Sequence, residues 1–240
     1  MADERIALVT GANKGIGAAI AAGLVARGLT VVVAARDAAK GAAAAQEIGA
    51  QQVTLDVTDD ASVTQAAKEV QERFGRLDVL VNNAGISGGR NQVPGAVEMD
   101  TIRAIFETNV YGVIRVTEAF LPLLRQSTDA RIINVSSGTA SLGWMTDPDH
   151  GFAARGTMAG YPPSKTALNM LTVQYAKALA DDGITVNAIA PGACNTDFAT
   201  ALGITLDRTA AQGAAIAIDL ATGPDRPTAS FMSDEGQIPW

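Results

Sequence analysis

A tyrosine and a lysine stand four residues apart in the string Tyr161-Pro-Pro-Ser-Lys165. On a helix this spacing places both side chains on one face, one turn apart. A phenol with a pKa of about 10 is a poor acid–base catalyst near neutral pH, and a nearby ammonium favours its charged form. The pair therefore predicts a group for acid–base chemistry, although an isolated pair is more typical of a half-buried aromatic beside an exposed charge.

Three glycines lie close together in the string Thr10-Gly-Ala-Asn-Lys-Gly-Ile-Gly17. Glycine lets a backbone approach a ligand closely, and the amide groups at a helix N-terminus favour a phosphate. The string fits neither a P-loop nor G-x-G-x-x-G, because Ile20 takes the third glycine position counted from Gly15. It still predicts a loop for the pyrophosphate of a dinucleotide, with tight packing of a strand against a helix as the alternative.

The chain alternates short apolar runs with longer segments of helical composition. The runs predict seven strands: Arg5–Thr10, Leu29–Ala35, Gln52–Asp56, Asp78–Asn82, Arg131–Ser136, Thr185–Ala190 and Ala229–Phe231. The longer segments predict six helices: Gly15–Arg27, Ala38–Ile48, Asp59–Phe74, Met99–Leu124, Tyr161–Asp181 and Thr205–Ala221. Such alternation indicates a mainly parallel sheet covered on both faces. The expected fold class is α/β, a doubly wound Rossmann-like domain.

No linker, repeat or charge block divides the 240 residues, so a single domain is expected over 1–240. The least regular stretches, 86–97, 138–160 and 192–204, each follow the carboxyl end of an expected strand. Open α/β sheets bind their ligands at that edge. We therefore expect the active site there, with a variable insertion at 138–160 and a substrate-loop region at 192–221.

Further strings follow the glycine loop in a recognisable order. They are Asp56-Val57, Asn82-Asn-Ala-Gly85, Asn109 in Thr-Asn-Val-Tyr-Gly112, Asn134-Val-Ser-Ser137, Tyr161-Pro-Pro-Ser-Lys165 and Pro191-Gly-Ala-Cys-Asn-Thr196. Apart from the string around Asn109, which falls within the expected helix Met99–Leu124, each lies at an expected strand end or helix start. In this combination the chain resembles the short-chain dehydrogenase/reductase family, and its ending, 231–240, is similar to that of carbonyl-reductase-like members.

The resemblance implies a role for individual residues. Tyr161 would donate a proton to a carbonyl oxygen as NADPH delivers hydride, and Lys165 would hold the nicotinamide ribose and favour the phenolate. Ser137 would donate a hydrogen bond to the same oxygen, and Asn109 would hold a water that joins Lys165 to solvent. Ser136 competes with Ser137, but neighbours along a strand point to opposite sides. The implied cofactor-binding residues are Gly11, Asn13, Lys14, Gly15, Ile16, Gly17, Arg36, Asp56, Val57, Asn83, Ala84, Gly85, Tyr161, Lys165, Pro191, Gly192, Ala193 and Thr196.

Charge at the end of the second expected strand bears on the choice of cofactor. At that place an acidic side chain would bind a free 2′-hydroxyl, and an arginine would bind a 2′-phosphate. The strand is followed by Arg36, and Lys14 in the glycine loop adds a second positive charge. These residues favour NADPH over NADH. Two alternatives stay open: Asp37 faces the ribose instead, or Arg36 is only a solvated charge at a helix start.

The composition argues against several classes of partner. With 18 Lys+Arg against 25 Asp+Glu, the net charge of −7 disfavours a nucleic-acid surface. One cysteine, Cys194, and one histidine, His150, predict no internal disulfide and no metal site. The charged start of the chain and its short first apolar run predict neither a signal peptide nor a membrane span, so we expect a cytoplasmic protein.

Two features depart from the minimal pattern of the family. Pro162 and Pro163 follow the tyrosine, and since proline is tolerated only in the first helical turn, the helix must begin close to Tyr161. The stretch from Ser137 to Tyr161 is also long. In carbonyl-reductase-like relatives an insertion here covers a dimerisation face, which implies a lean towards a monomer over a homo-oligomer.

Apolar side chains in the two variable segments are candidates for a substrate pocket: Trp144, Met145, Phe152, Met158, Phe198, Leu202, Ile204 and Leu206. They suit a hydrophobic or aromatic carbonyl compound, unless they belong to the core. The expected function is NADPH-dependent reduction of a ketone or aldehyde to an alcohol. An NAD-dependent alcohol dehydrogenase working in the oxidative direction and a non-catalytic NADPH-binding sensor are the alternatives.

Overall fold

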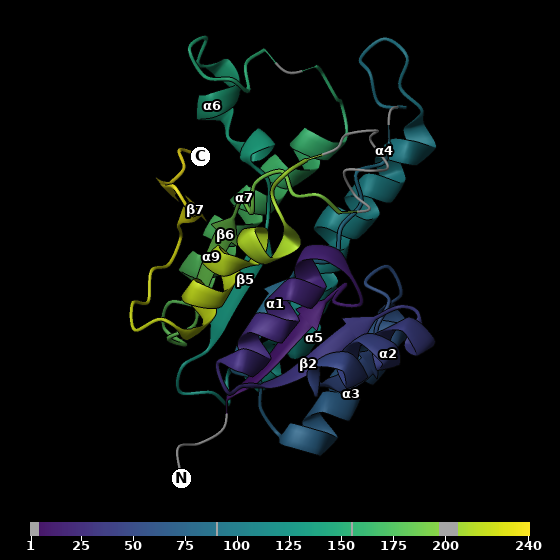
Figure 1. Ribbon diagram of the computed structural model, residues 1–240, viewed down its shortest axis with the longest axis vertical. Coiled ribbons are helices and arrows are strands. Elements are labelled where there is room, and N and C mark those ends of the chain that lie inside the picture. Colours follow the sequence, from purple (N-terminus) through teal and green to yellow (C-terminus); the bar gives the residue numbers. More distant parts are fainter. Residues whose placement is uncertain (1–4, 90, 155, 197–205) are drawn as a thin grey trace.

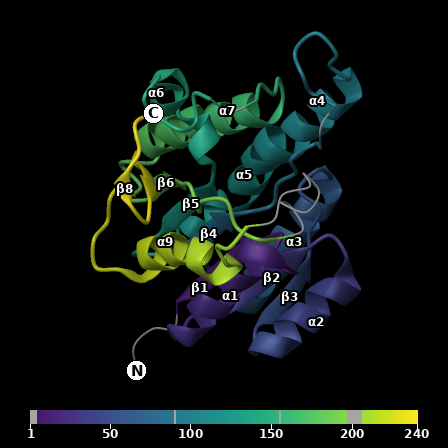
Figure 2. The ribbon, with the colours of Figure 1, turned by 45° about the horizontal axis from the view of Figure 1, so that its top comes forward.

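The computed structural model describes residues 5–89, 91–154, 156–196 and 206–240. Its centre is a twisted sheet with the strand order β3-β2-β1-β4-β5-β6-β7-β8, and helices cover both faces (Figure 1 and Figure 2). The strands are β1 Ile6–Thr10, β2 Thr30–Ala35, β3 Gln51–Thr54, β4 Val79–Asn82, β5 Arg131–Val135, β6 Thr185–Ile189, β7 Phe231–Ser233 and β8 Gly236–Gln237.

The described helices connect these strands in chain order. They are α1 Gly15–Ala26, α2 Ala38–Ile48, α3 Asp60–Phe74, α4 Met99–Phe106, the π-helical turn η1 Glu107–Tyr111, α5 Gly112–Leu124, the 3₁₀ turn η2 Gly138–Ala140, α6 Leu142–Thr146, α7 Tyr161–Ala178 and α9 Ala210–Thr222. No helix in the described ranges is long and apolar enough to cross a bilayer.

The α/β fold with a mainly parallel sheet is confirmed, but two details of the prediction are wrong. The sheet has eight described strands rather than seven, because β8 pairs antiparallel with β7; two residues are too few for a pattern to be detected. The helix expected over Met99–Leu124 is interrupted by η1. A π turn inserts one residue without changing composition, so hydrophobic periodicity does not reveal it, although such turns often accompany functional sites.

Side chains along each central strand alternate between two apolar cores. Ile6 and Leu8 belong to the core beneath α3, α5 and α7, whereas Ala7 and Val9 belong to the core beneath α1, α2 and α9. The fully buried Phe120 fills the first of these, and burial of such a ring contributes about 1.5–3 kcal/mol. In the second core α1 and α9 lie side by side in front of the sheet (Figure 1). Burial on both faces explains the continuous apolar runs.

The strand order reverses at β1. The chain runs from β1 outwards to β2 and β3, and then returns to place β4 on the other side of β1. In doubly wound sheets this reversal opens a crevice at the carboxyl ends of the two central strands. The segments that follow β1, β4, β5 and β6 therefore meet at one edge, and these segments carry the candidate residues.

The segment 138–160 packs towards the C-terminal strands. The Ser141 hydroxyl donates to the Pro239 carbonyl over 2.5 Å, and the Gly143 amide donates to the Trp240 carbonyl over 3.2 Å. The Trp240 ring in turn stacks on Phe231, with 5.6 Å between ring centroids. The first part of this segment is therefore anchored to the end of the chain.

Candidate active site

The glycine loop after β1 is held against the segment after β4. The side-chain nitrogen of Asn83 donates to the Thr10 carbonyl over 2.8 Å. The Thr10 hydroxyl accepts from the backbone amides of Asn83 and Ala84, both at 3.0 Å. Gly11 has a φ of +63°, and a Cβ there would lie 3.0 Å from the Ala84 Cα. Only glycine allows this turn to lie so close to the neighbouring strand end.

The start of α1 suits a bound anion. Its N-cap residue is Lys14, whose side chain has no acceptor for the first helical amide groups. A phosphate at this position would take the place of a capping side chain and would lie at the positive end of the helix dipole. A Cβ on Gly15 would lie 3.6 Å from the Thr196 methyl group, so the segment after β6 passes over the same turn.

Substituting Gly17 by alanine is expected to weaken dinucleotide binding. A Cβ on Gly17 would lie far inside contact distance of the Asn83 amide nitrogen and 2.6 Å from the Gly11 carbonyl oxygen. Overpacking of this kind costs about 1–3 kcal/mol and would displace the loop. We expect a lower Tm and a higher Kd for NADPH, measured by thermal unfolding and by fluorescence titration. Gly151→Ala, where a Cβ would meet nothing within 4 Å, is the control; equal effects of both variants would contradict the account.

Arg36 follows β2 and is exposed, whereas the next residue has a structural task. The Asp37 carboxylate caps α2 by accepting from the Lys40 amide over 3.0 Å, and it also pairs with the Lys40 ammonium at 3.5 Å. These bonds lower the pKa of Asp37. The carboxylate that competed with Arg36 for a ribose is thus engaged at a helix start.

Asp56 and Val57 come shortly after β3, the strand that pairs with β2. Burial works against the charged form of Asp56, yet hydrogen bonds from Thr58 and the charge of Arg36 lower its pKa overall. The Asp56 carboxylate accepts from the Thr58 amide and hydroxyl at 2.9 and 2.7 Å. Arg36 and Asp56, which the sequence predicts separately as cofactor-binding residues, therefore lie near each other.

Ser137 and Tyr161 meet at the carboxyl edge of the sheet. The Ser137 side chain is hydrogen-bonded to the Tyr161 phenol, and its hydroxyl also lies 2.9 Å from the Thr139 hydroxyl. The preceding Ser136 points into the protein, where its hydroxyl donates to the Asn169 side-chain oxygen over 2.6 Å. Strand alternation therefore separates the two serines and brings the second one to the tyrosine.

Lys165 is buried one turn along α7 from Tyr161. Its ammonium donates to the Val135 carbonyl over 2.7 Å and lies 6.0 Å from the centroid of the Tyr161 ring. A Cβ on Gly85 would lie 3.4 Å from the Lys165 nitrogen and 3.2 Å from the Asn109 side-chain oxygen. Glycine at 85 therefore leaves the space in which these groups meet.

Asn109 lies within the π turn and is fully buried. Its side-chain oxygen accepts from the Ile86 amide over 2.9 Å, and its nitrogen donates to the Ile86 carbonyl and the Ser164 hydroxyl over 3.0 and 3.1 Å. These bonds join the segment after β4 to the first turn of α7. Asn109 thus fixes the two elements that carry Gly85 and Lys165.

In the protein alone, the Tyr161 phenol is less acidic than a free phenol, and the Lys165 ammonium is more acidic than a free ammonium. Burial raises the pKa of Tyr161 to about 12, against the hydrogen bond from Ser137, which lowers it. Burial also lowers the pKa of Lys165 to about 8. In the protein alone the phenol is therefore held protonated, because desolvation outweighs the lysine charge, whose closest partner is the Val135 carbonyl.

The lowered pKa of Lys165 predicts a pH-dependent stability. Between pH 8 and 10.5 the folded lysine has lost its proton while the unfolded lysine keeps it. The free energy of unfolding of the wild type should therefore rise relative to that of Lys165→Met, by up to about 1.4 kcal/mol per pH unit. Urea unfolding of both proteins from pH 7.5 to 10 measures this difference. A difference between the two proteins that stays constant over this pH range would contradict the prediction.

The segment after β6 is tied down by a residue that the sequence did not indicate. Arg208 donates to the Pro191 carbonyl over 2.9 Å and pairs with Asp234 at 2.7 Å, while its own carbonyl accepts from the Asn195 amide over 2.7 Å. The Cys194 sulfur lies 3.5 Å from the Pro191 carbonyl oxygen, and burial raises the pKa of its thiol. Cys194 is therefore a small buried residue that fills space in the segment after β6.

Aromatic rings form one wall beside Ser137. His150 stacks on Trp144 with 4.5 Å between centroids, and Phe152 lies 5.6 Å from Trp144. Both Phe152 and Trp144 cover Gly138, the residue after Ser137. Of the other apolar candidates, Met145, Met158 and Leu206 are partly buried or exposed, and Phe198, Leu202 and Ile204 lie outside the described residues.

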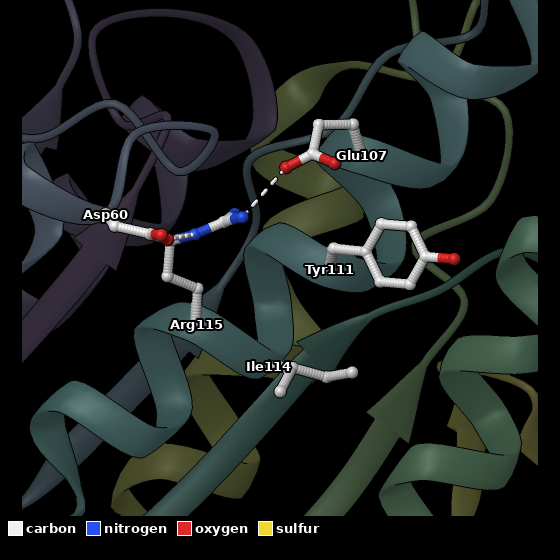
Figure 3. A pocket seen from close by; sticks show the side chains of 5 residues that line it. All are labelled: Asp60, Glu107, Tyr111, Ile114 and Arg115. Atoms are coloured by element: carbon white, nitrogen blue, oxygen red, sulfur yellow. Dashed lines mark hydrogen bonds and ion pairs between the residues drawn. The ribbon is translucent and has the colours of Figure 1, made fainter.

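A pocket of about 450 Å³ lies apart from this edge. Figure 3 shows the Arg115 guanidinium between the carboxylates of Asp60 and Glu107, with the Tyr111 ring pointing away from the ion pairs. Arg115 also donates to the Val57 carbonyl over 2.6 Å. The charged groups of this pocket are paired with one another, so their task is to brace the segment after β3 against η1.

The predicted residues thus gather at one edge. Ser137, Tyr161, Lys165 and Asn109 converge near Gly85, and the glycine loop, 83–84 and Thr196 lie together beside them. Arg36 and Asp56 lie beyond the loop. The partly buried Ile16 side chain packs against the core beneath α1, α2 and α9. Lys14, Gly192 and Ala193 are exposed.

Comparison with known proteins places this arrangement in a family. The family model for short chain dehydrogenase matches residues 5–207. The chain is 38% identical over 245 residues to the short-chain dehydrogenase anuI of Penicillium roqueforti, covering 97% of this chain and 95% of that protein. It is 35% identical over 202 residues to the 3-oxoacyl-acyl-carrier-protein reductase FabG of Escherichia coli (strain K12), covering 83% and 78%.

Solved structures agree with this assignment. NADPH-bound carbonyl reductase from chicken fatty liver superposes with a TM-score of 0.84 at 29% identity, covering 99% of both chains. The RhlG/NADP complex of Pseudomonas aeruginosa gives a TM-score of 0.83 at 31% identity, covering 96% of this chain and 94% of that one. The fold and the site define an α/β oxidoreductase. The chain belongs to the short-chain dehydrogenase family.

Proposed function

We propose that the protein reduces a ketone or aldehyde, hydrophobic or aromatic, to an alcohol with NADPH as the hydride donor. The convergence of Ser137, Tyr161 and Lys165 beside a glycine loop carries this proposal. A phenol held protonated and bonded to a serine hydroxyl suits an acid that gives its proton to an oxygen. The aromatic wall of Trp144 and Phe152 next to Ser137 supports an apolar substrate.

The residues divide the work as follows. The dinucleotide, when bound, supplies the hydride. Tyr161 releases its proton to the substrate oxygen, and Ser137 donates a hydrogen bond to that oxygen. Lys165, which is cationic below its pKa of about 8, stabilises the phenolate that remains and holds the nicotinamide ribose. Asn109 keeps α7 in place against the segment after β4.

The proposed preference for NADPH rests on Arg36. Its guanidinium offers a planar set of donors to a 2′-phosphate, and Lys14 adds positive charge from the glycine loop. The nearest competitor for a free 2′-hydroxyl, Asp37, is engaged as the N-cap of α2, which supports this preference. The similar structures of carbonyl reductase bound to NADPH and of RhlG in complex with NADP support the same choice. The described residues of the variable insertion 138–160 and of the substrate-loop region 192–221 complete the proposed site on the substrate side.

A spectrophotometric screen tests the function. NADPH oxidation is followed at 340 nm with a panel of aliphatic and aromatic ketones and aldehydes, and NADH is run in parallel. We expect turnover with NADPH and apolar carbonyl compounds. Faster oxidation of alcohols with NAD than reduction with NADPH would favour the oxidative dehydrogenase instead, and NADPH binding without turnover of any compound would favour a sensor.

A further inference from the structure

Gln92 is a fully buried amide that touches the start of α7. Its side-chain oxygen accepts from the Tyr161 backbone amide over 2.7 Å. Its side-chain nitrogen donates to the carbonyls of Ser87 and Gly89 over 2.7 and 2.6 Å. Its own backbone carbonyl accepts from the Ala159 amide over 2.7 Å. One side chain therefore joins the segment after β4 to the residue that carries the phenol.

The start of α7 depends on this bond because of its sequence. Helix N-termini leave their first amide groups without partners inside the helix, and a side chain at the N-cap usually accepts one of them. Here the N-cap is Gly160, which has no side chain, and the second and third helical residues are Pro162 and Pro163, which have no N–H. The Tyr161 amide is the first-turn donor that remains, and Gln92 accepts from it.

The approach between the two segments is close enough to need glycine. A Cβ on Gly160 would lie 3.0 Å from the Gln92 side-chain oxygen, 2.7 Å from Ile105 and 2.8 Å from Ile102. The amide is therefore enclosed by α4 and by the turn before α7.

We propose that Gln92 is a positioning residue for the proton donor: it holds the first turn of α7, and with it Tyr161, at a fixed distance from the segment after β4. This inference rests on the proposed function of Tyr161. Without these bonds, the Tyr161 amide and the carbonyls of Ser87 and Gly89 lose the partner that Gln92 supplies, and the first turn of α7 opens. A shift of about 1 Å in a catalytic group can lower a rate about 10²-fold.

The test compares two buried amides with matched apolar replacements. Gln92→Met removes the hydrogen bonds and keeps the length of the side chain. Asn187→Leu does the same for an amide that joins β6 to the Pro227 carbonyl and the Ser230 backbone. We expect Gln92→Met to lower kcat for carbonyl reduction at least about tenfold with the Kd for NADPH within twofold. Asn187→Leu should lower Tm to a similar degree while kcat stays within twofold.

Hydrogen exchange supplies a readout that does not depend on turnover. Because two prolines follow Tyr161, a peptide covering 160–165 reports mainly the amides of Tyr161, Ser164 and Lys165. We expect Gln92→Met to lose protection in this peptide and Asn187→Leu to keep it. If Gln92→Met does not fold, Gln92→Asn withdraws the amide by one methylene and should give the same pattern.

Three results would overturn the inference. They are retention of kcat within threefold in a folded Gln92 variant, an equal loss of kcat in Asn187→Leu, and unchanged protection of the 160–165 peptide. A wild type that reduces no carbonyl compound would refute the proposed function and the role of Gln92 in proton donation, whereas exchange would still decide whether Gln92 fixes the helix start.

Discussion

Replacing Tyr161 by phenylalanine should lower kcat for carbonyl reduction by about 10²–10⁴-fold, the range usual for the loss of a general acid. The substitution removes only the hydroxyl that is bonded to Ser137. The Kd for NADPH should change little, because the ring and the backbone bond to Gln92 remain. Steady-state kinetics with the best substrate of the screen, together with a fluorescence titration of NADPH, measure both quantities.

Tyr175→Phe is the matched control for this experiment. Tyr175 also lies on α7, but its hydroxyl donates to Glu118 over 2.7 Å at an exposed site. Its kcat should stay within about twofold of the wild type, since the loss of such a bond costs only about 0.5–1.5 kcal/mol of stability. A Tyr161→Phe variant that keeps wild-type activity would remove the proposed proton donor from the mechanism.

Exchanging Arg36 for aspartate should reverse the cofactor preference. Losing charge-assisted hydrogen bonds worth about 1.5–3 kcal/mol lowers kcat/KM with NADPH about 10- to 150-fold. The new carboxylate repels the 2′-phosphate and accepts hydrogen bonds from the free hydroxyls of NADH, so efficiency with NADH should rise. The ratio of kcat/KM for the two cofactors, measured at one ionic strength, is the relevant quantity.

Lys68→Asp controls for the change in net charge. Lys68 lies on α3 with a side chain that is 66% exposed, paired with Glu72. Because it is remote from the glycine loop, its substitution should leave the cofactor ratio within about twofold, as expected for a screened surface charge. An unchanged ratio in Arg36→Asp would show that this arginine does not contact the cofactor phosphate.

The sheet and the grouping of the candidate residues could be predicted because both depend on local strings. The β-branched runs fix strands buried on both faces, and the rule for strand ends then brings their following residues to one edge. Alternation predicts that Ser136 and Ser137 point to opposite sides, whereas the choice of Ser137 rests on the resemblance to the family. The prolines after Tyr161 likewise fixed the first residue of α7.

Other parts of the site depend on contacts between distant segments, for which the sequence holds no local pattern. Gln92 and Tyr161 are 69 residues apart, and Arg115 and Val57 are 58 apart. A glutamine in an irregular segment resembles any solvated polar residue until the fold encloses it. The raised pKa of Tyr161 in the protein alone could not be predicted for the same reason, since it depends on how deeply the fold buries the phenol.

The anchoring of Ser141 and Gly143 to Pro239 and Trp240 affects how substrate range could be engineered. A loop graft that replaces 138–160 by the equivalent stretch of a relative would remove Ser141 and Gly143. The carbonyls of Pro239 and Trp240 would then lose the groups that donate to them. We expect such chimeras to work only when the donor's residues after 237 are transferred as well. The two stretches form one exchangeable unit, although 77 residues of sequence lie between them.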